Sequence, residues 1–219
     1  EIEAQLSNEL NADDWWTLYD RLTDWQIKFD NYNDTGLGSI LNEQIQTCNR
    51  EFINFIESNY ESWMQSNNRP TLSVDIVPKY IKPILDKGEK VCLLVVDCMR
   101  HDHFKSMMSL LEPFFNIKLD YKLSLLPTAT PYSRNAIFCG LFPDDMVKKY
   151  PKQGDDMKND STSLNQHEKQ FLIDQLKKMD LGDKRVHYHK IWAVEEGNKF
   201  NNRIKDYLQQ DILALVVNF

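Results

Sequence analysis

The sequence predicts a helical bundle followed by an α/β domain whose sheet is largely parallel. Between residues 37 and 63, apolar residues recur at every third or fourth position, which is the period of an amphipathic helix. Residues 91–96 and 212–217 are apolar runs of strand length, typical of strands that are covered on both faces. Strand and helix patterns alternate between these two runs, and such alternation indicates a parallel α/β sheet.

Residues 1–66 are predicted to form two or three helices that pack as an antiparallel bundle. Asn11 is expected to cap the second helix, because its side-chain oxygen can accept hydrogen bonds from amides of the first turn. Gly36 and Gly38 predict a turn over residues 31–39. The third helix carries the longest apolar stripe of the chain: Leu37, Leu41, Ile45, Cys48, Phe52, Ile56, Tyr60 and Trp63. The charged faces of these helices are expected to be solvated, and a partner surface is the alternative.

Residues 67–77 are polar and lack periodicity, so we predict a linker there and assign residues 78–219 to the α/β domain. A helix over 78–87, closed by Gly88, opens this domain. The further predicted elements are helices over 103–111, 132–138, 167–179 and 198–210, strands over 116–125 and 185–191, and a polar excursion over 148–165. The inner face of the helix over 103–111 is predicted to consist of Met107, Leu110 and Leu111.

Composition excludes several classes of protein. The 219 residues include 26 basic and 33 acidic side chains, and the net charge of −7 argues against a nucleic-acid coat protein or a polybasic membrane binder. No apolar run approaches the roughly 20 residues that cross a bilayer, and no signal peptide is visible. Cys48 and Cys92 are expected to be reduced core thiols of a cytosolic protein. Both ends of the chain fall inside apolar patterns, so we expect them to be cut from a longer protein.

Asp97 directly follows the first apolar run, where ligands bind in α/β sheets. It is therefore a candidate metal ligand or catalytic carboxylate, and the alternative is that it caps the helix after it. His101 and His103 are two positions apart and give a weak zinc signal. Ordinary surface or capping histidines are the alternative interpretation of that pair.

Two prolines bracket Thr128 and Thr130 just before the helix over 132–138. Pro131 at the first helical position makes Thr130 a natural N-cap. The functional interpretation uses the same place, because a hydroxyl beside the free amides of a helix N-terminus suits an attacked phosphate. A threonine is a poor nucleophile unless a metal ion lowers the pKa of its hydroxyl. This interpretation therefore needs a metal, and Asp97 is the candidate to hold it.

The two segments together resemble the alkaline phosphatase superfamily. The closer similarity is to the PglZ domain of PorX-type response regulators, and it is carried by the sequences DCMRHD over 97–102 and LPTATPYSRNAIFCGLFP over 126–143. Such regulators are two-component proteins linked to type IX secretion, with a receiver domain, a helical middle region and a C-terminal PglZ domain. Residues 1–66 are similar in organisation to the middle region. The resemblance thus implies a helical bundle followed by a truncated alkaline-phosphatase-like domain.

The resemblance also implies a site for two zinc ions. Asp97 would be a metal ligand, and Thr130 would touch metal and act as the nucleophile, with Thr128 as the alternative. Arg134, near the start of the next helix, is a candidate phosphate contact, and an ordinary surface arginine is the alternative. The superfamily completes its site with later blocks of Asp and His that residues 1–219 do not contain. His187 and His189 do not match those blocks and are expected to share one strand face as structural or rim residues.

The leading hypothesis is a fragment of a cytoplasmic response regulator whose PglZ domain is a zinc-dependent phosphodiesterase acting on oligonucleotides. The fragment itself is expected to hold half of the metal site and to be inactive. The alternative is a signalling adaptor whose helices and PglZ fold mediate phosphorylation-controlled dimerisation and partner binding. The expected partners are an oligonucleotide substrate, proteins of the secretion or signalling system and a second copy of the chain, without insertion into a membrane.

Overall fold

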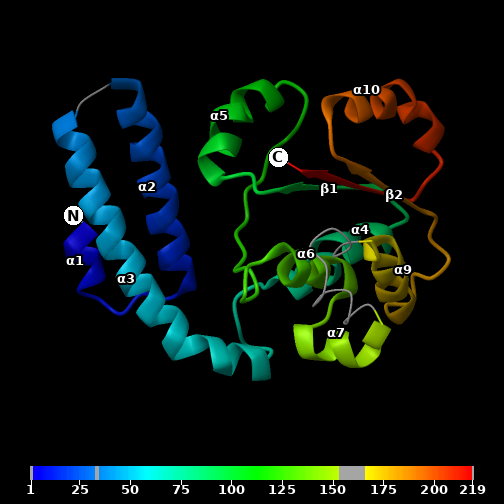
Figure 1. Ribbon diagram of the computed structural model, residues 1–219, viewed down its shortest axis with the longest axis horizontal. Helices are drawn as coiled ribbons and strands as arrows, with labels where there is room; N and C mark the ends of the chain where they lie inside the picture. The colour runs from blue at the N-terminus through cyan, green and yellow to red at the C-terminus, as the bar shows by residue number, and fades with distance from the viewer. Residues whose placement is uncertain (1, 33–34, 153–165, 219) are drawn as a thin grey trace. The chain divides into compact units, whose positions relative to one another are not determined.

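The computed structural model describes residues 2–32, 35–152 and 166–218, and it divides into two compact units (Figure 1). The helical unit comprises Glu1–Pro70 and Met99–Tyr121, and the α/β unit comprises Thr71–Cys98 and Lys122–Phe219. The segment 99–121 therefore groups with the helices, and its predicted place in the α/β domain is wrong. The predicted excursion over 148–165 falls mostly outside the described residues.

The helical unit is built from α1 (Ile2–Leu6), α2 (Ala12–Tyr32), α3 (Thr35–Gln65) and α5 (His101–Leu111), and Figure 1 shows α2 and α3 side by side. Asn11 caps α2 as predicted: its Oδ1 atom accepts hydrogen bonds from the amides of Asp13 at 2.8 Å and Asp14 at 3.1 Å. The Asp14 carboxylate accepts from the Asn11 amide in return. The predicted turn over 31–39 is wrong at its C-terminal end, because α3 already begins at Thr35.

The core of the helical unit confirms most of the predicted stripe. Its buried residues are Ile2, Trp15, Leu18, Leu22, Leu41 and Cys48. The ring of Trp15 meets the ring of Phe52 edge to face at 5.2 Å between centroids, and Phe55 meets Trp63 in the same way at 5.4 Å. Leu37, the first residue of the stripe, is 46% exposed, so the packed face begins one turn later at Leu41.

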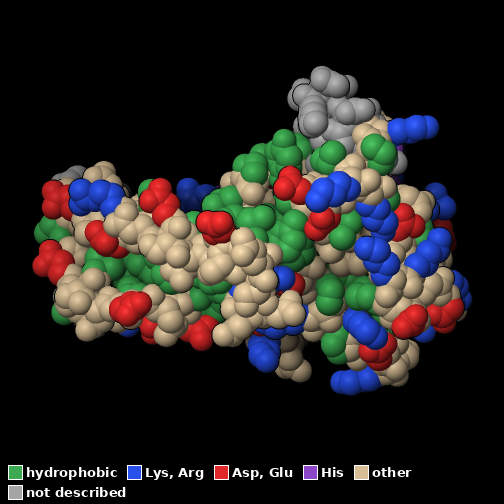
Figure 2. Space-filling view, turned by 90° about the horizontal axis from the view of Figure 1, so that it is seen from below, with side chains coloured by type: hydrophobic (Ala, Val, Ile, Leu, Met, Phe, Trp, Pro, Cys, Tyr) green, Lys and Arg blue, Asp and Glu red, His purple; other side chains and the backbone are tan. Residues whose placement is uncertain are grey.

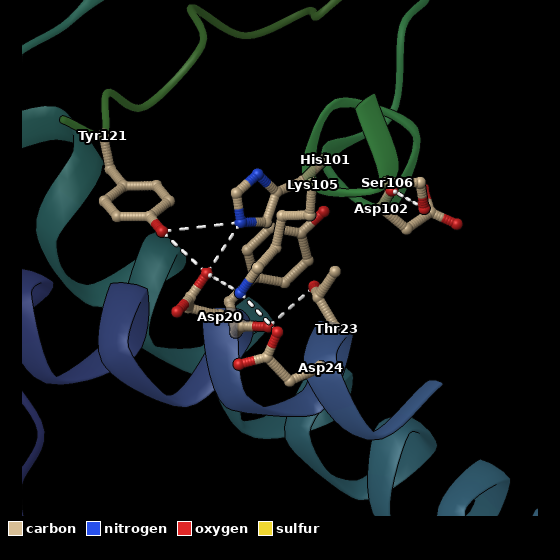
Figure 3. A network of polar contacts seen from close by, with 9 residues as sticks. Asp20, Thr23, Asp24, His101, Asp102, Lys105, Ser106 and Tyr121 are labelled. Atoms are coloured by element: carbon tan, nitrogen blue, oxygen red, sulfur yellow. Dashed lines mark hydrogen bonds and ion pairs between the residues drawn. The ribbon is translucent and has the colours of Figure 1, made fainter. Parts of the chain in front are cut away.

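A polar network joins α5 to α2 within the helical unit (Figure 3). The Oδ1 atom of Asp20 lies 2.8 Å from Nε2 of His101, accepts from the ammonium group of Lys105 at 2.8 Å and accepts from the hydroxyl of Tyr121 at 2.9 Å. Lys105 also forms an ion pair with Asp24 at 2.6 Å. Burial alone would raise the pKa of Asp20, but these hydrogen bonds outweigh it and lower the pKa to about 2.

The apolar face predicted for this helix is wrong for two of its three residues. Met107 is 40% exposed and Leu110 is 70% exposed, whereas Leu111 is half-buried. The polar side chains of His101 and Lys105 contact α2. Periodicity shows which residues share a helix face, but it does not show which neighbour covers that face.

The α/β unit contains a three-stranded parallel sheet, as predicted. Strand β3 (Ile212–Asn218) lies between β1 (Val91–Asp97) and β2 (Val186–Ile191), and Ile212 is in register with the first residue of each neighbour. The other elements of this unit are η1 (Ser73–Asp75), η2 (Val77–Ile81), α4 (Lys82–Leu85), α6 (Thr130–Cys139), α7 (Pro143–Lys149), α9 (Glu168–Lys178), α10 (Val194–Asn202) and η3 (Ile204–Tyr207).

One face of this sheet carries the main core. Its central residues, Ala214 and Val216, are fully buried together with Phe138 of α6 and Leu172 of α9. On the other face Leu94 of β1 is 54% exposed, so the prediction that this strand is covered on both faces is wrong. Cys92 on the same face is exposed, so its assignment as a core thiol is also wrong, whereas Cys48 is buried as expected.

Three further predictions about local structure need correction. The predicted strand over 116–125 is reduced to an isolated bridge between Leu123 and Leu72. Leu72 and Val77 are fully buried, so part of the predicted linker packs into the α/β unit. The helix predicted over 198–210 begins earlier, as α10, and ends at Asn202 before η3.

Gly140 ends α6 and lets this helix approach α9 closely. The helix ends at Gly140, whose φ of +60° is the left-handed conformation that glycine adopts easily. A Cβ atom at this position would lie 2.2 Å from the side-chain nitrogen of Gln175 on α9. Glycine therefore allows both the turn and the close approach of these two helices.

The two units differ in charge. Residues 1–70 and 99–121 carry 16 acidic and 7 basic side chains, whereas residues 71–98 and 122–219 carry 17 acidic and 19 basic ones. Figure 2 shows the same contrast: acidic side chains predominate on α1, α2 and α3, and many basic side chains lie on the α/β unit. The negative charge of the chain thus comes from the helical unit.

Candidate active site

The candidate site lies at the carboxyl edge of the parallel sheet, where α/β proteins bind ligands. Asp97 is the last residue of β1, and its register partner on β3 is Asn218. The parallel pairing of the two strands therefore brings these two side chains to the same edge. The side chain of Asp97 is 24% exposed, so its carboxylate is partly open to solvent.

Thr130 faces Asp97 across this edge. The hydroxyl of Thr130 lies 3.4 Å from Oδ2 of Asp97, a long hydrogen bond. Thr130 is the first residue of α6, and the preceding Ala129 has extended backbone angles. The prediction that Thr130 caps the helix is therefore wrong, since its hydroxyl is turned to the carboxylate of β1. Thr128 is exposed.

Arg134 joins the same edge from the next turn of α6. Its Nη1 atom donates to Oδ2 of Asp97 at 2.6 Å and to the side-chain oxygen of Asn218 at 3.3 Å. Only 4% of Arg134 is exposed, so the alternative of an ordinary surface arginine is wrong. Its guanidinium group ties the start of α6 to the ends of β1 and β3.

A buried carboxylate lies on the other side of Arg134. Glu168, the first residue of α9, is fully buried, and its Oε1 atom accepts from Nε of Arg134 at 2.6 Å. Its other oxygen accepts a short hydrogen bond from the hydroxyl of Tyr188 and lies 3.7 Å from the ammonium group of Lys190. Burial, together with the Glu168 charge, raises the pKa of Tyr188. Burial lowers the pKa of Lys190, and Glu168 opposes that effect.

Glu168, Tyr188 and Lys190 were not among the site residues predicted from the sequence. Tyr188 and Lys190 alternate along β2 with His187 and His189, so each pair faces one side of the sheet. The signal available in the sequence was that Tyr188 and Lys190, which are polar, lie on the side of β2 that faces the core. Glu168 gave no local signal, because an acidic residue at a helix start normally serves the helix dipole.

His101, His187 and His189 have described partners other than Asp97 and Thr130. His101 is in the first turn of α5 and pairs with Asp20 in the helical unit. His187 and His189 share one face of β2, as predicted, and their rings are stacked with centroids 6.3 Å apart. His187 also stacks on Tyr207 at 4.0 Å, which is a packing role.

Two family models match the chain. A model of the PorX response regulator linker domain matches residues 1–64, and a model of the BREX system PglZ alkaline phosphatase-like domain matches residues 76–219. The chain belongs to the PglZ alkaline phosphatase-like family. The resemblance seen in the sequence is thereby confirmed, as is the order of a PorX-type helical region and a PglZ domain. A search of curated proteins gives no match. In the described part of the chain, no helix combines the length and the apolar character that crossing a bilayer requires.

The PglZ domain presents oxygen donors at the carboxyl edge of its sheet. A carboxylate such as that of Asp97 is a ligand that zinc accepts in catalytic sites, and the hydroxyl of Thr130 lies beside it. Within residues 2–32, 35–152 and 166–218, no group of three or more His, Cys, Asp and Glu side chains is placed to hold a metal ion. Asp97 and Thr130 alone are fewer than the three protein ligands that a catalytic zinc site typically has.

Proposed function

We propose that the chain is part of a response regulator whose PglZ domain is a zinc-dependent phosphodiesterase. The observation that carries this proposal is the contact between the hydroxyl of Thr130 and the carboxylate of Asp97 at the carboxyl edge of the sheet. The family match supplies the reaction class, because it relates the domain to alkaline phosphatases.

In this proposal Thr130 is the nucleophile and Asp97 holds the metal. Zinc, when bound, supplies the positive charge that makes a hydroxyl ionise near neutral pH. Oγ1 of Thr130 gives up its proton and attacks phosphorus; the new O–P bond forms, the bond from phosphorus to the leaving oxygen breaks, and the leaving oxygen takes up a proton. Water then adds to phosphorus, the bond from phosphorus to Oγ1 breaks, and Oγ1 takes a proton from that water, which regenerates the hydroxyl. Thr130 is favoured over Thr128 because Thr130 lies against Asp97 whereas Thr128 is exposed.

The burial of Arg134 changes the role that we propose for it. A guanidinium group that is 4% exposed and paired with two carboxylates is poorly placed to bind substrate directly. We therefore propose Arg134 chiefly as the group that orients Asp97. A phosphate contact through its Nη atoms stays a hypothesis.

The proposed substrate is an oligonucleotide, as the resemblance to PorX-type PglZ domains implies. The α/β unit has two more basic than acidic side chains, whereas the helical unit has nine more acidic ones. An anionic substrate is therefore repelled less by the unit that carries Asp97 and Thr130. We propose a cytoplasmic protein that is linked to the regulation of type IX secretion.

A signalling adaptor is the second candidate function. It is favoured by the match of residues 1–64 to a PorX response regulator linker domain. In this case the helical unit would relay receiver phosphorylation to dimerisation or to docking of secretion or signalling proteins, and the PglZ fold would serve as a binding platform. The two functions are compatible, and turnover by the intact parent protein decides whether the enzymatic one exists.

The test is a set of three threonine variants in the intact parent protein, assayed on an oligonucleotide with zinc present. Thr130→Ala should lower turnover by orders of magnitude, since the attacking atom is lost. Thr130→Ser keeps a hydroxyl and should keep substantial turnover, and Thr128→Ala is the matched control. Thr130→Ala should be well folded, because the lost contact is long and Thr130 does not cap α6.

The outcomes of this test separate the alternatives. Near-normal turnover of Thr130→Ala together with an inactive Thr128→Ala would show that Thr128 is the nucleophile. Full activity of both alanine variants would exclude a covalent threonine intermediate. Absence of turnover in the wild-type parent would leave the adaptor as the function.

A further inference from the structure

We infer that Glu168 is a positioning residue for the proposed reaction, acting on Asp97 through Arg134. The inference rests on the proposed function of the Asp97–Thr130 pair. It concerns a side chain on α9 that is fully buried and does not touch Thr130 or Asp97 in any described contact. Arg134 contacts both Glu168 and Asp97 and therefore connects the two carboxylates.

The geometry of Arg134 makes it a rigid connector. The guanidinium group is planar, so fixing two of its nitrogens fixes the orientation of the whole group. Glu168 accepts from Nε at 2.6 Å, and Asp97 accepts from Nη1 at 2.6 Å. A shift of the Glu168 carboxylate thus rotates or withdraws the donor that holds Oδ2 of Asp97, which is the same oxygen that faces Thr130.

Glu168 is itself fixed from a second side. Its Oε2 atom accepts from the hydroxyl of Tyr188 and lies 3.7 Å from the ammonium group of Lys190, both on β2. A buried carboxylate is tolerated only when it is paired and hydrogen-bonded, and Glu168 meets both conditions. Its position is therefore set by α6 and by β2 together.

Charge adds a second effect to the geometric one. Arg134 is shared between two carboxylates, so Asp97 is not fully neutralised by it. Without the charge of Glu168, the guanidinium group would pair with Asp97 alone and compete with a cation for that carboxylate. The charge of Glu168 thus offsets part of the positive charge of Arg134 and leaves Asp97 able to attract a metal ion.

A purely structural role is the competing explanation, since the same contacts connect α6, α9 and β2. The two roles differ in what they predict for Asp97. If Glu168 only stabilises the fold, its loss should resemble the loss of another polar contact of α9 and act on stability. If Glu168 positions Asp97, its loss should change the environment of the Asp97 carboxylate and the metal affinity specifically.

The test compares Glu168→Gln with a matched control on the same helix. Glutamine keeps the size of the side chain and an oxygen for Nε of Arg134, but it removes the charge. The control is Asp174→Asn, which also removes a carboxylate from α9, one that accepts from the hydroxyl of Tyr150 at 3.0 Å. In the 219-residue chain, the carboxyl ¹³C resonance of Asp97 and the Nε–H resonance of Arg134 are recorded at one pH. In the intact parent, zinc affinity is measured by calorimetry with the metal alone.

We expect Glu168→Gln to shift both resonances and Asp174→Asn to shift neither. We expect zinc affinity of the parent to fall about 10–100-fold in Glu168→Gln only, as happens when partners behind a metal ligand are removed. Unchanged resonances in Glu168→Gln, or equal losses of affinity in both variants, would overturn the inference. Measurements on the wild-type parent test the proposed function separately. That function fails if the wild-type parent binds no zinc or shows no turnover.

If Glu168→Gln does not fold, Tyr188→Phe replaces it. This variant removes only the hydroxyl that holds Oε2 of Glu168 and keeps every charge. A shift of the Asp97 resonance in the folded Tyr188→Phe chain supports the inference, and an unchanged resonance overturns it.

Discussion

Replacing Asp20 by Asn should destabilise the helical unit by an amount that depends on pH. One carboxylate oxygen of Asp20 serves three partners from the segment 99–121: His101, Lys105 and Tyr121 (Figure 3). Asparagine is nearly the same size, but it lacks the charge and cannot attract Lys105. The substitution therefore tests whether this network holds α5 against α2.

The magnitude follows from the pKa of Asp20, which the network lowers from 3.8 to about 2. At about 1.4 kcal/mol per pKa unit, this would correspond to about 2.5 kcal/mol of stability above pH 5. The side chain of Asp20 is 34% exposed, and solvent screening reduces the effect of such ion pairs. We therefore expect Asp20→Asn to lower the free energy of unfolding at pH 7 by about 1 kcal/mol.

The sign of the pH dependence follows from the same shift. The folded-state pKa of Asp20 lies below the unfolded-state value, so its contribution is complete above about pH 5 and is lost as the pH falls from about 4 to about 2. Wild-type protein should lose this contribution in acid, and Asp20→Asn should lack that part of the decline. The difference between the two proteins should thus shrink as the pH falls through about 2.

Urea denaturation followed by circular dichroism at several pH values measures this difference. Asp24→Asn is the matched control, because Asp24 also lies on α2 and its described ion pair is with Lys105 alone. Asp24→Asn should lower the free energy of unfolding less than Asp20→Asn does. It should also keep the loss of stability in acid that comes from protonation of Asp20. Equal stability of Asp20→Asn and wild type at pH 7 would refute the reasoning, as would parallel pH profiles.

Two further predictions concern the cores of the units. Trp63→Asp should lower the free energy of unfolding by about 3–5 kcal/mol, because Trp63 is 7% exposed and a carboxylate would replace a packed ring; unchanged melting would show that this residue is not core. Burial raises the pKa of the Cys139 thiol to about 11, so Cys139 should react with a thiol reagent at pH 8 only after unfolding, whereas the exposed Cys98 should react at once. Equal reaction rates of the two thiols in the native protein would contradict this expectation.

The sequence predicted the parts of the site that follow from local patterns. An apolar run that ends in Asp97 and a Pro-bracketed pair of threonines before a helix are visible within short windows, and the structure places Thr130 against Asp97. Glu168 and Tyr188 were not predictable in this way. Their roles arise only when α9 and β2 are packed beside α6, and that packing depends on residues distant in the chain.

The same distinction explains the failed predictions for α5 and β1. The spacing of Met107 and Leu110 correctly places them on one helix face, and the apolar run of β1 correctly predicts a strand. Coverage of those surfaces is a tertiary property, and Leu94 and Leu110 are exposed in the structure. Local sequence patterns therefore predict which segments form helices and strands, whereas the burial of a side chain depends on the elements that pack beside it.

The order of the strands has a consequence for how the chain forms during synthesis. β1 is followed by the segment 99–121 of the helical unit, and its pairing partner β3 begins at Ile212, 115 positions after Asp97. When Tyr121 leaves the ribosome, the helical unit is complete, while β1 is the only described strand of its sheet that has been made. An apolar strand with open edges is prone to pair with other chains. The nascent protein should therefore depend most on chaperones between the synthesis of Tyr121 and that of β3.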